Sequence, residues 1–177
     1  MPLTTDPGVL LETLSTITEF SIGLAGFSGV AAAIMQRSGT TTELDRFRIT
    51  FNICVSLVPG FVAFLALSLI NSGTENSLVV ASASGAIAVA YIAMLPVLPV
   101  LRRKAGGFKR YNPIALGIFV LTTWINLPLQ LYNAVASPES ASGILVAGLT
   151  MLLLAGAANF AGLLWQMLGY GTPQSQT

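Results

Sequence analysis

Residues Asp6 to Arg37, DPGVLLETLSTITEFSIGLAGFSGVAAAIMQR, decide the fold, because they form one continuous helical pattern that contains a membrane span. Asp6 is a favourable N-cap, and Pro7 suits the first helical position, where its missing N–H costs nothing. From Ile17 to Met35 the residues are apolar or small, and this length is enough to cross a bilayer once. The stretch therefore predicts a transmembrane helix at the start of the chain.

The composition places the rest of the chain in the same class. Of its 177 residues 54% are hydrophobic and 8% are charged, whereas soluble domains carry roughly a quarter charged residues. Cys54 is the one cysteine, which excludes an intramolecular disulfide, and the lack of histidine removes the commonest metal ligand and general base. We expect a single membrane domain over residues 1–177, with its first span retained, no cofactor or metal, and no nucleic acid partner.

Five apolar segments follow one another along the chain. The expected helices cover residues 7–36, 47–70, 78–101, 113–135 and 144–168, and the polar residues 169–177 are expected to be a disordered tail. Lengths near 20 residues are typical of membrane helices and not of the shorter strands of a membrane barrel. The predicted fold class is therefore all-α, an integral membrane bundle of five transmembrane helices.

The basic residues predict the orientation of the bundle. Three of them, Arg37, Arg46 and Arg48, flank the first connection, and the other five lie in the third. The N-terminal tail and the second and fourth connections contain none. Because basic loops stay on the cytoplasmic side, the N-terminus is expected outside and the C-terminus inside.

The third connection, RRKAGGFKRY, is also a candidate lipid-binding segment. Its cations are Arg102, Arg103, Lys104, Lys109 and Arg110. Near an anionic lipid surface each would contribute about 1 kcal/mol to binding. A role in topology alone is the other interpretation, and the two do not exclude each other.

Glu19 is the acid that the first helix brings into the membrane, and no other span carries one. Positions 12, 16, 19, 23 and 26 fall on one helical face, which therefore carries Glu12 and Thr16 as well. Within the apolar segment Glu19 lies near the outer edge. It is either an interfacial residue that reaches the headgroups or an acid that holds a proton in the membrane.

The fourth span carries a polar stripe in its outer half. Thr122 or Thr123, Asn126, Gln130 and Asn133 recur on one helical face. Because this is the depth range of Glu19, we expect a polar outer cluster of Glu12, Glu19, Asn126, Gln130 and Asn133. The stripe is either a set of interhelical hydrogen bonds or a polar vestibule.

Two further sets of residues predict helix packing. Gly23, Gly26 and Gly29 remove side chains from one face of the first helix, which makes that face a candidate packing seam. In the inner half, the second span carries Arg48, Asn52 and Ser56 on one face, and the fifth span carries Asn159 and Gln166. Structural pairing between helices is the expected role of the inner set.

The run TEFSIGLAGFSG, residues 18–29, carries a resemblance to known proteins. Glu19, the glycines that follow it, and a second span that opens with arginines resemble a family of small uncharacterised bacterial multi-pass inner-membrane proteins. The resemblance covers the first hairpin, about a third of the chain. It implies a location in the bacterial inner membrane and implies no activity.

These patterns favour a non-enzymatic membrane protein that associates with itself or with other membrane proteins. No arrangement of Ser, His and Asp is possible without histidine, and no phosphate-binding loop is present. The alternative is a homo-oligomeric channel, or a transporter linked to protons or cations, with Glu19 near its outer mouth.

Overall fold

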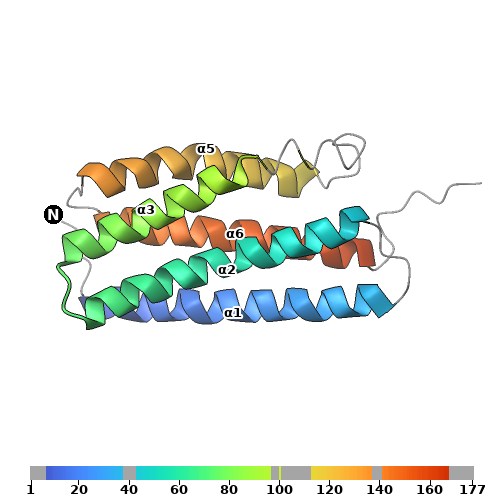
Figure 1. Ribbon diagram of the computed structural model, residues 1–177, viewed down its shortest axis with the longest axis horizontal. Helices are drawn as coiled ribbons and strands as arrows, with labels where there is room; N and C mark the ends of the chain where they lie inside the picture. The colour runs from blue at the N-terminus through green and yellow to red at the C-terminus, as the bar shows by residue number, and fades with distance from the viewer. Residues whose placement is uncertain (1–6, 38–42, 97–99, 101–112, 137–140, 168–177) are drawn as a thin grey trace, which may run out of the picture.

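The computed structural model describes residues 7–37, 43–96, 100, 113–136 and 141–167. This part of the chain is helical and contains no strand. Its five helices, which carry the labels of Figure 1, are α1 (Pro7–Arg37), α2 (Glu43–Asn71), α3 (Asn76–Met94), α5 (Pro113–Ala136) and α6 (Ala141–Met167). The all-helical class expected from the sequence is confirmed.

The helices run side by side in alternating directions, with α1 and α5 on opposite sides of the bundle (Figure 1). α1 packs against α2 and α6, whereas α5 packs against α3 and α6. α6 therefore joins the two halves of the molecule. We call the end at which α1, α3 and α6 begin the N-terminal end of the bundle.

Four of the described helices are long and apolar enough to cross a membrane. The qualifying segments are Gly8–Ile34, Ile49–Asn71, Asn76–Met94 and Ala141–Gly162. α5, with 24 residues, is not among them, so its role as a fifth span stays a prediction. The expected tail over 169–177 and the basic segment at 102–110 lie outside the described residues.

α3 is shorter than the apolar run that predicts it. The expected segment covers residues 78–101, but the helix ends at Met94. Leu95 still donates its N–H to the carbonyl of Tyr91, at an N–O distance of 3.1 Å. Pro96 follows and has no N–H with which to continue the helical hydrogen bonds, so the helix ends at Met94 and Leu95 is its C-cap.

The apolar core lies where α1, α2, α3 and α6 meet. Its fully buried members include Leu14 on α1, Ala63 on α2, Ile87 on α3 and Leu149 on α6. Large apolar side chains also cover the outside of the bundle, and Phe20, Phe61 and Trp124 are more than 60% exposed. An apolar exterior around an apolar core is typical of helices that face lipid.

Candidate functional site

Three amide side chains of α5 are buried in one half of the bundle. Asn126, Gln130 and Asn133 are each exposed by 1% or less, although all three are strongly polar. Their spacing along the chain places them on one face of α5, turned toward α3 and α6. The buried threonines Thr122 and Thr123 precede them on the same helix.

The three amides donate to successive backbone carbonyls of α6. The nitrogen of Asn126 lies 2.9 Å from the Gly148 oxygen, that of Gln130 lies 2.9 Å from the Ile144 oxygen, and that of Asn133 lies 2.9 Å from the Ala141 oxygen. The order runs in opposite directions along the two helices, as antiparallel neighbours require. We call these three amides and three carbonyls the amide ladder.

Each ladder amide uses its second N–H on a further side chain. Asn126 Nδ2 lies 3.0 Å from the hydroxyl of Tyr91, and Asn133 Nδ2 lies 2.7 Å from the hydroxyl of Ser84, so that α3 is tied to the ladder twice. Gln130 Nε2 donates to Asn126 Oδ1 at 3.0 Å. The ladder therefore joins three helices, and all of its N–H groups are used.

Tyr91 and Ser84 are site residues that the sequence analysis missed. The run of small residues in the first half of α3 predicts only a close approach to a neighbour, and names no hydrogen-bond partner. The acceptors on α6 are backbone carbonyls, which leave no sequence signal of any kind. On α6 the sequence reflects the contact with α5 at Gly148, because a side chain at that position would meet Gln130.

Two amide oxygens of the ladder have no described partner. Gln130 Oε1 and Asn133 Oδ1 are buried and accept no hydrogen bond. A buried acceptor that is left unpaired costs free energy, and this cost offsets part of the stabilisation from the hydrogen bonds that the same amide donates. The ladder can therefore only accept further hydrogen bonds, because it has no free N–H to donate.

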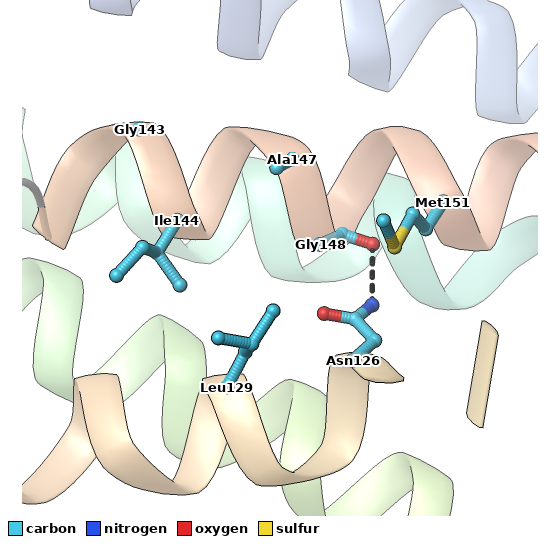
Figure 2. Close-up of a pocket in the computed structure, with 7 residues that line it drawn as sticks. All are labelled: Asn126, Leu129, Gly143, Ile144, Ala147, Gly148 and Met151. Carbon is cyan, nitrogen blue, oxygen red and sulfur yellow. Dashed lines mark hydrogen bonds between the residues drawn. The ribbon is translucent and has the colours of Figure 1, made fainter. Parts of the chain in front are cut away.

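A small groove of about 220 Å³ runs beside the ladder between α5 and α6 (Figure 2). Leu129 and Ile144 lie across it from one another, and Met151 lies near Gly148. Asn126 is its one polar lining residue, and that amide already takes part in three hydrogen bonds. The groove thus presents an apolar wall with little capacity to recognise a polar ligand.

The two acids expected in the polar cluster lie elsewhere. Glu12 and Glu19 are exposed on α1, whose packing partners are α2 and α6, while the three amides lie on α5. The buried face of α1 carries Leu14, Ile17 and Ser21, and the acids occupy the opposite face. The structure brings the three amides together and leaves both acids apart from them.

The outward face of α1 follows an unbroken repeat. Positions alternate by four and three residues, as on the contact face of a coiled coil. Six of the seven are exposed, and Gly23 is half-buried. We call this face the α1 seam: Glu12, Thr16, Glu19, Gly23, Gly26, Val30 and Ala33.

The predicted packing glycines border open space in the described structure. A Cβ atom placed on Gly23, Gly26 or Gly29 would meet nothing within 4 Å. By contrast, a Cβ on Gly60 of α2 would lie 2.6 Å from Ser21 Cβ on α1. These three glycines are therefore not required by the packing of α1 against the other described helices.

Polar contacts fix the register of α1 against its two neighbours. Asn52 Nδ2 on α2 donates to Ser28 Oγ on α1 at 2.8 Å, and Gly60 faces Ser21, two turns further along. On α6, a Cβ on Gly156 would lie 3.2 Å from Leu24 on α1. α1 thus runs antiparallel to α2 and parallel to α6.

This register places Glu19 beside apolar stretches of both neighbouring helices. Glu19 lies level with about Val62 of α2, whose apolar stretch continues for eight residues to Ile70, about 12 Å along a helix. It also lies level with about Met151 of α6, roughly 15 Å from Ala141, where that helix begins. The polar residues near the N-terminus of α1 thus lie at levels where its neighbours remain apolar, and the position of Glu19 relative to the membrane edge stays a prediction.

The inner polar set is only partly paired. Besides the Asn52–Ser28 bond, Ser56 Oγ lies beside Gly156, and Asn159 follows one turn later on α6. Asn52 Oδ1, Ser56 Oγ and Asn159 Nδ2 are buried without a described partner. The side chains of Arg48 and Gln166 lie outside the described residues.

The other predicted sites have no described geometry. Arg102, Arg103, Lys104, Lys109 and Arg110 all fall in the connection between α3 and α5, outside the part of the chain that the structure describes, so their contact with anionic lipid stays a prediction. Among the described residues, no group of three or more Cys, Asp or Glu side chains could hold a metal ion.

No family model, curated protein or solved structure matches this chain. The resemblance of the first hairpin to small bacterial inner-membrane proteins therefore stays a prediction.

Proposed function

We propose that this chain is a non-enzymatic integral membrane protein that acts by helix association, as a homo-oligomer or as a small subunit of a larger inner-membrane assembly. The observation that carries this proposal is the α1 seam, which is turned away from the other described helices. Its glycines border open space, so a helix from another chain can approach the α1 backbone closely.

The seam has the periodicity that helix pairing requires. A repeat of four and three residues keeps one face toward a partner along a left-handed crossing of about 20°. Glycine is the residue that permits the closest contact of two membrane helices, because van der Waals packing and not the hydrophobic effect drives their association. The amide ladder supports the same proposal indirectly. Its N–H groups are all used within the chain, so none is left to donate a hydrogen bond to a ligand.

Conduction by a single copy has less support than association. The amide ladder lies toward the N-terminal end of the bundle and the inner polar set toward the other end. Between Gly148 and Gly156 on α6, Leu149 and Leu152 are fully buried in the apolar core. A conducting path along α6 would have to cross this apolar layer.

The proposal includes a five-span bundle in the bacterial inner membrane with its N-terminus outside. Its support is the placement of all eight basic residues on the first and third connections. A cysteine at Glu75, in the exposed turn between α2 and α3, is expected to react with an impermeant maleimide added to intact spheroplasts. Labelling only after the membrane is opened would contradict this orientation.

A large side chain placed in the α1 seam tests whether the seam is the contact between chains. Gly26→Leu should reduce the fraction of assembled protein by at least tenfold, because the leucine side chain would separate the two helices, and cross-linking in native membranes measures that fraction. The single copy should remain folded, since the space beside Gly26 is open.

A matched control exists on α6. Gly143 is also exposed and also borders open space, so Gly143→Leu adds the same side chain away from the seam. We expect wild-type assembly for this control. Equal assembly of the Gly26 and Gly143 variants would rule out the seam as the contact.

A further inference from the structure

Three buried polar groups lack partners where α1, α2 and α6 pack together. Asn52 Oδ1 and Ser56 Oγ on α2, and Asn159 Nδ2 on α6, make no hydrogen bond with the described residues. All three residues lie in segments that are long and apolar enough to span a membrane. Because lipid tails offer no hydrogen bond, a polar group at such a place needs a partner inside the protein or an ordered water.

The register of α2 and α6 brings these groups to one level. A Cβ on Gly156 of α6 would lie 3.0 Å from Ser56 Oγ and 3.5 Å from Ser56 Cα, so these two residues face each other. Asn159 follows Gly156 by three residues, and Asn52 precedes Ser56 by four. Because the two helices are antiparallel, both steps lead toward the same end of the bundle, by about one turn. The two amides therefore lie on facing helices about one turn beyond Ser56.

A contact with α1 decides which atom of Asn52 is left unpaired. The hydroxyl of Ser28 donates to the carbonyl of Leu24 at 2.8 Å, so toward Asn52 it can only accept. Asn52 Nδ2 donates to it at 2.8 Å. The amide is held in this orientation, and its Oδ1 remains as an acceptor on a residue that is 1% exposed.

A proline in α2 leaves a further acceptor beside these groups. Pro59 lies inside the helix and has no N–H, so the carbonyl of Val55 loses its usual partner four residues on. Val55 directly precedes Ser56, and both are fully buried. Prolines are tolerated in membrane helices where side chains or ordered waters satisfy the carbonyls that they free.

The mixture of donors and acceptors selects the ligand. The N–H groups of Asn159 would repel a metal cation, and the Oδ1 atom of Asn52 would repel an anion. A water molecule both donates and accepts, and a buried water typically makes about three hydrogen bonds. Gly156 brings no side chain against Ser56, so α6 leaves the hydroxyl uncovered on this side.

We propose that one water molecule binds between α2 and α6, donating to Asn52 Oδ1 and Ser56 Oγ and accepting from Asn159 Nδ2. We call these three residues the water site. Because Asn52 also donates to Ser28, the bound water completes a polar joint between α1, α2 and α6. The water site lies within one chain, so this inference does not rest on the proposed association.

Removal of one hydroxyl tests the water site by the sign of its effect. Ser56→Ala should lower the Tm of the purified protein in detergent by about 2–4 °C, because the bound water loses one of its hydrogen bonds. Without a bound water, the same change removes an unpaired buried hydroxyl, and the Tm should stay the same or rise.

Ser21→Ala is the matched control. Ser21 is also fully buried with an unpaired Oγ, but it faces Gly60, away from the water site. We expect its Tm to equal or exceed that of the wild type. A Ser56→Ala variant with a Tm no lower than that of Ser21→Ala would overturn the proposal.

Nuclear magnetic resonance can detect the water at Asn159 directly. In solid-state spectra of the ¹⁵N-labelled protein in lipid vesicles, magnetisation from water should reach the side-chain amide of Asn159 at least about threefold faster than that of Asn126. Asn126 is the control because it donates to Tyr91 and to Gly148. The variant Asn159→Leu, which lacks the amide, identifies the signal.

The two measurements must agree. Transfer to Asn159 no faster than transfer to Asn126 would overturn the proposal even if Ser56→Ala lowers the Tm, since a direct bond within the protein would then account for the loss. Faster transfer to Asn159 together with a lowered Tm of Ser56→Ala would establish the water site.

Discussion

Replacing Gly148 by alanine is expected to destabilise the protein by at least about 2 kcal/mol, the sum of overpacking and of lost hydrogen bonds in the amide ladder. A Cβ at this position would overlap the Gln130 amide and would lie 2.8 Å from Asn126 Oδ1. Both amides would have to leave positions in which they donate to α6 carbonyls. Thermal unfolding of the purified protein in detergent measures the loss.

The same substitution at Gly143 provides the control. Gly143 lies on α6 as well, but nothing stands within 4 Å of its added Cβ. There the higher helix propensity of alanine should leave stability unchanged or raise it by up to about 1 kcal/mol. Opposite signs at the two glycines would locate the effect in the ladder, and a neutral Gly148→Ala would show that the ladder contributes little.

Gly60→Ala is expected to cost about 1–3 kcal/mol through a clash between α1 and α2. The added Cβ would lie 2.6 Å from Ser21 Cβ and 3.2 Å from Ser21 Oγ. Since Cβ is the first atom of the serine side chain, rotation about its bonds cannot relieve the contact. The two helix backbones must separate instead, and chemical denaturation in mixed micelles would record the loss.

A second substitution should reverse this effect. Ser21→Gly removes the atoms that the new methyl group meets, so the double variant should recover most of the stability lost by Gly60→Ala. The coupling energy between the two positions is then expected to be at least about 1 kcal/mol. Additive effects would contradict the contact, and Gly85→Ala, with open space around it, controls for the change in propensity.

Sequence periodicity was sufficient to find the donors of the ladder. The spacing of Asn126, Gln130 and Asn133 puts them on one helical face in any α-helix, and amides in a span favour interhelical hydrogen bonds. It was not sufficient to find the acceptors, because the carbonyls of Gly148, Ile144 and Ala141 belong to a backbone that every sequence shares. Only the packing of α5 on α6 identifies them.

The sequence of α1 predicts the helical face on which Glu19 lies, but not its level relative to the neighbouring helices. The face that carries Glu12 and Glu19 follows from helical spacing, and the structure describes all of its positions. The level of Glu19 depends on how far α2 and α6 extend beyond it, which α1 alone does not encode. The predicted polar cluster joined both acids with the amides because their expected depths agree. The sequence pattern does not tell which helices are neighbours.

The amide ladder also sets the offset at which α5 and α6 pack. Its three donors meet carbonyls spaced by three and four residues, so a slide of α6 by a single residue would misalign every one of these bonds at once. Membrane helices lack a hydrophobic force that would favour one offset over another. Only four residues separate the two helices in the chain, and none of these bonds involves α1, so the offset of this hairpin does not depend on α1.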